Sequence, residues 1–175
     1  KNGELAFGIS EQKLNIQSTE YFTHAVKGDI VEVRPSVEPI ITEISNKISQ
    51  WGGISLIIDY GCWDLKGNTF QAIKSHKYIN PLEKPGEVDL TAHVDFSSLA
   101  RSVLNCSISK LTDQGVLLER LGISERANIL SRSLKADDLE NHIAAHRRLT
   151  HPNEMGTLFK VMAILPKLSR MPLGL

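Results

Sequence analysis

The stretch Ile54-Ser-Leu-Ile-Ile-Asp59-Tyr60-Gly61 decides the class of fold. Its apolar residues fall on both faces of an extended chain, which is typical of a parallel strand buried between two layers of helices. The diglycine Gly52-Gly53 precedes the strand, and an acid, a phenol and a glycine end it. We therefore expect a buried strand over 54–59 whose carboxyl end carries polar side chains.

An amphipathic helix is expected just upstream, from Pro35 to about Gln50. Gly52-Gly53 ends it, and its apolar residues recur at helical spacing: Val37, Ile40, Ile41, Ile44 and Ile48. A helix, a diglycine and a buried strand make half of a Rossmann-like unit. The sequence thus predicts an α/β fold.

The remaining elements follow from shorter patterns. Residues 62–95 hold many turn signals and are predicted to be irregular, and a loop of that length is usually functional or an insertion. Asp95 is expected to cap a helix over 96–104. We further predict strands over 5–9, 29–33, 107–111 and 157–165, and helices over 114–121, 125–131 and 137–148.

Composition excludes several classes of function. The 175-residue chain has 20 Lys plus Arg and 20 Asp plus Glu, so it lacks the basic surface of nucleic-acid-binding proteins and of proteins that bind anionic membranes. No apolar run approaches the roughly 20 residues that span a bilayer, and the polar start does not resemble a signal peptide. Cys62 and Cys106 match no metal or redox spacing. We expect no nucleic-acid partner and no membrane insertion.

The first candidate site is the strand end Asp59-Tyr60-Gly61. Ligands of open α/β sheets bind beyond the carboxyl ends of the strands, where an acid and a phenol could orient an amine or a guanidinium. The alternative is structural, with Asp59 capping the following turn and Tyr60 packing.

The second candidate site is the polar segment from Gln71 through His76 to His93 and Asp95. His93 and Asp95 share a face if the chain is extended, so they could bind a metal, or Asp95 could orient His93 as a general base. N-capping is nevertheless the default role of an Asp before a helix.

The third candidate is the pair His142 and His146, at a spacing that can place two imidazoles on one metal. No Glu follows His142 and two arginines follow His146, so a metal site is not expected here. The sequence also lacks a glycine-rich phosphate loop after a strand and a nucleophile elbow.

Several blocks resemble the MidA-like methyltransferase family, which includes a mitochondrial complex I assembly factor that methylates a protein arginine. They are LIIDYG (56–61), TFQAIKSHKY (69–78), DLTAHVDF (89–96), MGTLFKVMA (155–163), VEVRP (31–35) and QGVLLERLGISERA (114–127).

The resemblance implies a class I methyltransferase sheet, S-adenosylmethionine as cofactor and a protein substrate, in some members a subunit of respiratory complex I. Residues 1–175 would be the C-terminal part of one methyltransferase domain, with 62–95 as an irregular insertion on the active-site side. The residues that bind the cofactor would lie upstream of Lys1, so this chain alone is expected to be inactive. The expected compartment is the cytoplasm in bacteria and the mitochondrial matrix in eukaryotes.

We assign hypothetical roles from the chemistry of methyl transfer to an arginine. Asp59 and Asp95 are candidates for clamping an arginine guanidinium, and His93 for accepting its proton. The substrate side would be shaped by Tyr60, Gly61, Gln71 and His76. The alternatives are a non-catalytic assembly factor on the same fold and, less favoured, a metal-dependent hydrolase that uses His93 and Asp95 with His142 and His146.

Overall fold

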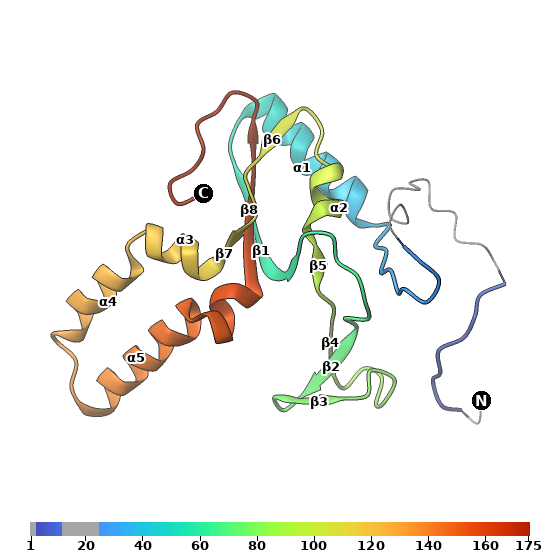
Figure 1. Cartoon of the computed structure of the whole chain (residues 1–175), viewed down its shortest axis with the longest axis horizontal. Helices are drawn as coiled ribbons and strands as arrows, with labels where there is room; N and C mark the ends of the chain where they lie inside the picture. Colours follow the sequence, from blue (N-terminus) through green and yellow to red (C-terminus); the bar gives the residue numbers. More distant parts are fainter. Residues whose placement is uncertain (1–2, 12–24) are drawn as a thin grey trace. The chain divides into compact units, whose positions relative to one another are not determined.

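A computed structural model describes residues 3–11 and 25–175 (Figure 1). The chain divides into two compact units, each of which is described by itself. Unit 1 comprises Lys1–Pro35 and Leu65–His93, and unit 2 comprises Ser36–Asp64 and Val94–Leu175.

Unit 2 is built on a mixed sheet of strand order β5-β1-β8-β6, with β7 also pairing with β8. The long strands β1 (Ser55–Cys62) and β8 (Phe159–Pro166) are antiparallel, while β5 (Val94–Asp95) runs parallel to the end of β1. The short strands β6 (Cys106–Ile108) and β7 (Thr112–Asp113) are antiparallel to β8.

The hydrophobic core lies on one face of this sheet, beneath α1 (Val37–Trp51) and α2 (Phe96–Arg101). Burying each large apolar side chain contributes roughly 1.5–3 kcal/mol. The buried cluster joins both helices to β8 through Ile41, Ile48, Phe96, Leu99, Met162 and Ile164. The sheet end that carries Asp59 is therefore supported by a rigid scaffold.

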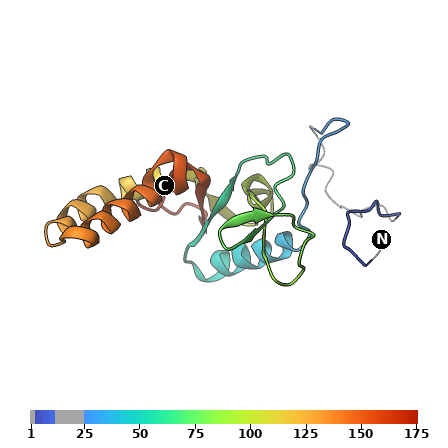
Figure 2. The same cartoon turned by 90° about the horizontal axis from the view of Figure 1, so that it is seen from below.

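Three helices connect β7 to β8: α3 (Gln114–Arg120), α4 (Ile123–Ser131) and α5 (Ala136–Thr150). Figures 1 and 2 show α4 and α5 side by side as a helical hairpin. Neither of these two helices has a buried residue. A π-helical turn over Pro152–Gly156 then leads into β8.

Unit 1 contains a small antiparallel sheet of order β3-β2-β4, built from β2 (Gln71–Lys74), β3 (Lys77–Ile79) and β4 (Asp89–Thr91). β2 and β3 form a hairpin whose two turn residues, Ser75 and His76, have φ of 49° and 62°. Two successive residues with positive φ are the mark of a type I′ hairpin turn.

This sheet corrects the prediction that residues 62–95 are irregular. Strands of three or four residues are too short to show the alternation of apolar and polar residues that predicts a strand. The turn-forming residues between them also favoured an irregular segment. Those turn residues connect the strands of a sheet and do not mark an unstructured loop.

Two predicted strands are wrong. Residues 5–9 and 29–33 form no strand, because within residues 3–11 and 25–175 neither segment has a neighbouring strand to satisfy its backbone groups. The side chains of Leu5 and Phe7 are 57% and 73% exposed. In the second segment, the Gly67 amide donates to the Ile30 carbonyl at 2.9 Å, and the Asp29 amide donates to the Val26 carbonyl at 3.0 Å.

The other elements agree with prediction to within a few residues at each end, including α1, β1, β8 and the three helices α3 to α5. The predicted environment of β1 is wrong. β1 pairs in parallel only at Gly61 and Cys62 and is antiparallel to β8 along its length. Leu56 and Ile58 are 52% and 49% exposed, so one face of β1 is only half covered.

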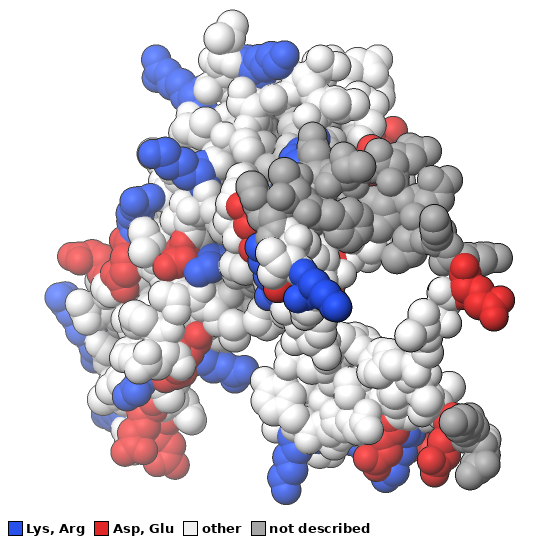
Figure 3. Space-filling view, turned by 45° about the vertical axis from the view of Figure 1, so that its right-hand side comes forward, with Lys and Arg blue, Asp and Glu red and all other residues white. Residues whose placement is uncertain are grey.

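The charges on the surface are mixed in sign. On the face that Figure 3 shows, basic and acidic side chains are interspersed over the described residues. Across residues 3–11 and 25–175, no helix combines the length and hydropathy that crossing a membrane requires.

Candidate functional site

The end of β1 places Asp59, Tyr60 and Gly61 beside β8 and β5 in unit 2. The Asp59 carboxylate accepts a hydrogen bond from the Tyr60 amide through Oδ1 at 2.8 Å. The Tyr60 ring packs edge-on against Phe159, with centroids 5.5 Å apart and planes at 82°. These contacts orient both side chains. Tyr60 packs, as its structural alternative expected, whereas Asp59 bonds the amide of the next residue within β1 and not that of a following turn.

Gly61 is the residue at which β5 meets β1. A Cβ at this position would lie 2.0 Å from the Val94 carbonyl oxygen, so only glycine allows the approach. The register pairs Gly61 with Val94 and Cys62 with Asp95. Gly61 thereby brings Asp95 next to the end of β1.

Asp95 caps α2, as the sequence predicted. Its Oδ1 accepts from the Ser97 amide at 3.1 Å and from the Ser97 hydroxyl at 2.8 Å, and the residue is 8% exposed. Its Oδ2 lies 3.8 Å from Nη2 of Arg101. Oδ1 of Asp95 is therefore occupied in capping α2.

Cys62 ends β1 and pairs with Asp95 of β5, but its thiol is a weak candidate for nucleophilic chemistry. Burial raises the pKa of the Cys62 thiol, and the negative charges of Asp95 and Asp64 raise it further, while Lys160 partly offsets them. A protonated thiol is a poor nucleophile. The carboxylates of this strand end are therefore stronger candidates for chemistry than its thiol.

Lys160 is a neighbour that the sequence did not reveal. It pairs with Asp59 across β1 and β8, so the two side chains share a face of the sheet. Its ammonium donates to Oδ1 of Asp113 and to the Thr157 carbonyl, both at 2.6 Å. The Asp59 carboxylate thus shares a sheet face with the Lys160 ammonium, which donates its hydrogen bonds to Asp113 and Thr157.

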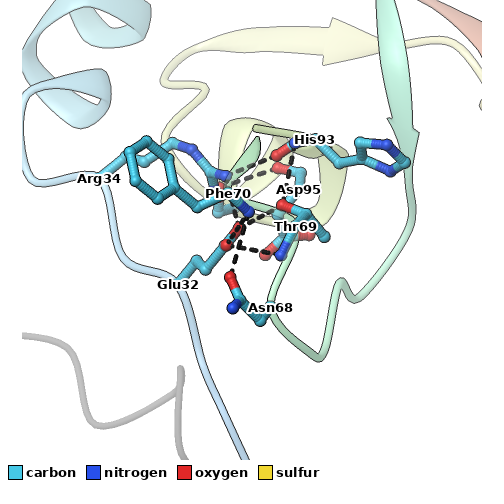
Figure 4. Close-up of polar contacts among 8 residues, drawn as sticks. Glu32, Arg34, Asn68, Thr69, Phe70, His93 and Asp95 are labelled. Carbon is cyan, nitrogen blue, oxygen red and sulfur yellow. Dashed lines mark hydrogen bonds and ion pairs between the residues drawn. The ribbon is translucent and has the colours of Figure 1, made fainter. Parts of the chain in front are cut away.

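The remaining predicted site residues, Gln71, His76 and His93, belong to unit 1. Gln71 begins β2 opposite Thr91, and His76 lies in the hairpin turn beyond the other end of β2. β2 alone extends over roughly 10 Å from Gln71 to Lys74, so the two residues lie at opposite ends of the strand and do not form one cluster. Figure 4 shows His93 beside a different group of polar residues.

Glu32 is the centre of that group. Its Oε1 accepts from the amides of Thr69 and Phe70 at 2.8 and 3.1 Å, and its Oε2 accepts from the Thr69 hydroxyl at 2.5 Å. Nη2 of Arg34 donates to the same Oε2 at 3.0 Å. Glu32 and Arg34 are not among the predicted site residues, although two charged residues within an apolar stretch were a usable signal.

The electrostatics of Glu32 favour the carboxylate. Partial burial tends to raise the pKa of Glu32, but hydrogen bonds from Thr69 and Phe70 and the charge of Arg34 outweigh burial and hold the pKa below its ordinary value. Glu32 is consequently ionised at neutral pH, where it joins its own segment to Thr69 and Phe70.

The two histidines of α5 are turned to different partners. Nε2 of His142 lies 3.0 Å from the Ala127 carbonyl, and Nε2 of His146 lies 3.2 Å from the Ser124 hydroxyl. In the described part of the chain, no three His, Cys, Asp or Glu residues are placed to hold a metal ion. No observation therefore supports a metal centre at this pair.

Comparison with known proteins bears on the chemistry of both units. The model of a family described as "Putative S-adenosyl-L-methionine-dependent methyltransferase" matches residues 2–112.

The chain belongs to this methyltransferase family.

Curated relatives of this chain include proteins named "Protein arginine methyltransferase NDUFAF7, mitochondrial". The Xenopus laevis protein is 35% identical over 143 residues, which are 79% of this chain and 32% of the relative. The human protein is 34% identical over 149 residues, 83% of this chain and 34% of the relative. This chain thus spans about a third of the length of these relatives.

Two solved structures from Burkholderia thailandensis share the fold. One uncharacterised protein superposes with a TM-score of 0.70 at 23% identity, covering 81% of this chain and 40% of its own. The other is described as a likely methyl transferase bound to S-adenosyl-homocysteine. It superposes with a TM-score of 0.68 at 23% sequence identity, covering 78% of this chain and 37% of its own. These matches confirm the predicted Rossmann-like α/β class of mixed strands and flanking helices.

The described residues do not by themselves fit S-adenosylmethionine. A nucleoside cradle needs open glycine backbone after a strand, whereas Gly52 and Gly53 precede β1. Gly61 does follow the body of the strand, but its Cα faces the Val94 carbonyl and leaves no space for a ligand.

Proposed function

We propose that the natural polypeptide carrying this sequence transfers a methyl group from S-adenosylmethionine to a protein arginine. Family membership supports the reaction class, and the names of the curated relatives support the arginine. The observation that carries the proposal for this chain is the carboxylate of Asp59, which the fold orients at the end of β1. S-adenosylmethionine, when bound, supplies the electrophilic methyl group.

Asp59 is the residue that we assign to the substrate guanidinium. Its Oδ1 is fixed by the Tyr60 amide, and its Oδ2 makes no hydrogen bond with a described residue. A carboxylate held in this way can pair with a guanidinium and direct one nitrogen toward the methyl donor. Asp95 has its Oδ1 committed to Ser97, so we assign it mainly to positioning α2.

His93 is the proposed acceptor of the proton that the guanidinium loses as its nitrogen is methylated. Tyr60, Gln71 and His76 remain candidates for the substrate side, whereas Gly61 is assigned to the close approach of β5 to β1. The proposed partner is a protein subunit of respiratory complex I. The proposed compartment is the mitochondrial matrix for a eukaryotic source, in line with the mitochondrial names of the relatives, and the cytoplasm for a bacterial one.

The test is transfer of labelled methyl groups to isolated complex I subunits, with the arginine located by mass spectrometry. Asp59→Asn is expected to lower the transfer rate about 100-fold, as a misplaced nucleophile does. Asp137→Asn, at an exposed acid of α5, is the matched control and should transfer normally. Capture of a subunit with no transfer by the wild-type protein would favour the non-catalytic assembly factor instead.

A further inference from the structure

The polar group around Glu32 forms a closed ring that includes both backbone polar atoms of His93. We infer that Glu32, Arg34 and Thr69 are positioning residues that fix His93 for the proposed methyl transfer. This inference rests on the proposed function, in which His93 accepts a proton. It adds three residues that act through His93 and do not touch the substrate.

The ring can be followed atom by atom in Figure 4. The Thr69 hydroxyl donates to Oε2 of Glu32 at 2.5 Å and accepts from the His93 amide at 3.0 Å. Nη2 of Arg34 donates to the same Oε2 at 3.0 Å and to the His93 carbonyl at 2.5 Å. The peptide groups on both sides of the His93 Cα are therefore held.

The second oxygen of Glu32 anchors the ring to the small sheet of unit 1. Oε1 accepts from the amides of Thr69 and Phe70, immediately before β2 begins at Gln71. The ring consequently joins three segments that are 37 and 59 residues apart in sequence. An ionised carboxylate with this many donors makes charge-assisted hydrogen bonds, which are stronger than neutral ones.

Fixing the backbone of His93 limits where its imidazole can stand. With the N–H and C=O groups held, the ring moves only by rotation about χ1 and χ2, which have a few preferred values. A proton acceptor must stand within hydrogen-bond reach of the proton that it takes, and small displacements are costly in rate. Loss of the ring should therefore slow the chemical step more than it weakens binding.

Thr69 gives the sharpest test, because its hydroxyl must donate and accept at once. Valine has the same shape and can do neither, whereas serine can do both. The matched control is Thr91→Val, since Thr91 lies in the same unit and its buried hydroxyl has no partner among the described residues. Each variant is to be made in the natural polypeptide and assayed for kcat, for KM of S-adenosylmethionine and for hydrogen exchange at the His93 amide.

Thr69→Val is expected to lower kcat about tenfold, with KM for S-adenosylmethionine unchanged and faster exchange at His93. Thr69→Ser should restore kcat to within about twofold, and Thr91→Val should leave it unchanged. Should Thr69→Val fail to fold, Arg34→Ala opens the ring from its other side and should show the same loss of kcat.

Two results would overturn the inference. One is a folded Thr69→Val or Arg34→Ala protein with wild-type kcat. The other is faster amide exchange at His93 in Thr69→Val together with a wild-type methyl-transfer rate for His93→Asn. The ring would then stabilise the structure without contributing to the reaction. Failure of the proposed function looks different, because the wild-type protein would then transfer no methyl group to any arginine.

Discussion

Thr69 and Thr91 show how differently two hydroxyls of the same unit can be used. The Thr69 hydroxyl takes part in two hydrogen bonds of the ring around His93. The Thr91 hydroxyl is buried and makes none with a described residue. A buried polar atom without a partner loses its hydration and gains nothing in return. Residue type alone therefore does not indicate whether a threonine stabilises this fold.

Thr91→Val is accordingly expected to stabilise the protein. Replacing the hydroxyl by a methyl group of similar shape should raise the free energy of unfolding by about 1 kcal/mol, whereas Thr69→Val should lower it by about 2 kcal/mol. Chemical denaturation of both variants measures the difference. A Thr91→Val protein that is less stable than wild type would mean that the hydroxyl has a bonding partner.

At the scale of elements, β1 and β5 can pair because residue 61 is a glycine and has no Cβ. The two strands pair only at Gly61 and Cys62, and the Val94 carbonyl occupies the space where a Cβ on residue 61 would stand. β5 leads directly into α2, whose Phe96 and Leu99 belong to the core. A change at Gly61 is therefore transmitted to the strand end and to the core together.

Gly61→Ala is expected to lower the free energy of unfolding by about 3 kcal/mol, because the added methyl group forces the two backbones apart. Gly8→Ala is the control, since a Cβ there meets no atom within 4 Å, and it should change stability by less than about 0.5 kcal/mol. Thermal unfolding followed by circular dichroism compares them. Equal melting temperatures would contradict the close approach of β5 to β1.

At the scale of the whole molecule, unit 1 and unit 2 are each stabilised internally by a different kind of interaction. The large buried side chains of the described residues all lie in unit 2, and Ala72 is the buried apolar residue of unit 1. Unit 1 relies instead on hydrogen bonds, above all those to Glu32. Because these hydrogen bonds require an ionised carboxylate, the stability of unit 1 depends on pH, whereas stability from apolar packing does not.

The direction of that dependence follows from the pKa of Glu32. The folded protein holds this pKa below the ordinary value of 4.5. Ionised Glu32 therefore contributes its stability above pH 4.5, and the contribution is lost as the pH falls through the lower, folded pKa. Unit 1 is expected to open in mild acid before unit 2.

Amide hydrogen exchange between pH 7 and pH 3 tests this expectation in β2 and β3 against β8. In the Glu32→Gln variant the acid-dependent part of the exchange in β2 and β3 should disappear, and these strands should already exchange faster at neutral pH. An unchanged acid transition in this variant would show that another group controls the opening of unit 1.

The sequence by itself determined the elements whose signal is local. The spacing of Ile41, Ile44 and Ile48 predicted α1, the apolar run before Asp59 predicted β1, and Asp95 was predicted to cap α2. Periodicity and capping act within a few residues, so they can be recognised without knowledge of the fold.

Only the tertiary structure decided which residues meet. The strands of unit 1, the packing of Gly61 against Val94, the nearness of Lys160 to Asp59 and the ring around His93 depend on partners far away in the chain. The hydrogen bonds of Glu32 span up to 38 residues, and no local pattern encodes such a distance. The strand end of the candidate site could therefore be predicted from sequence, while the residues that position His93 could not.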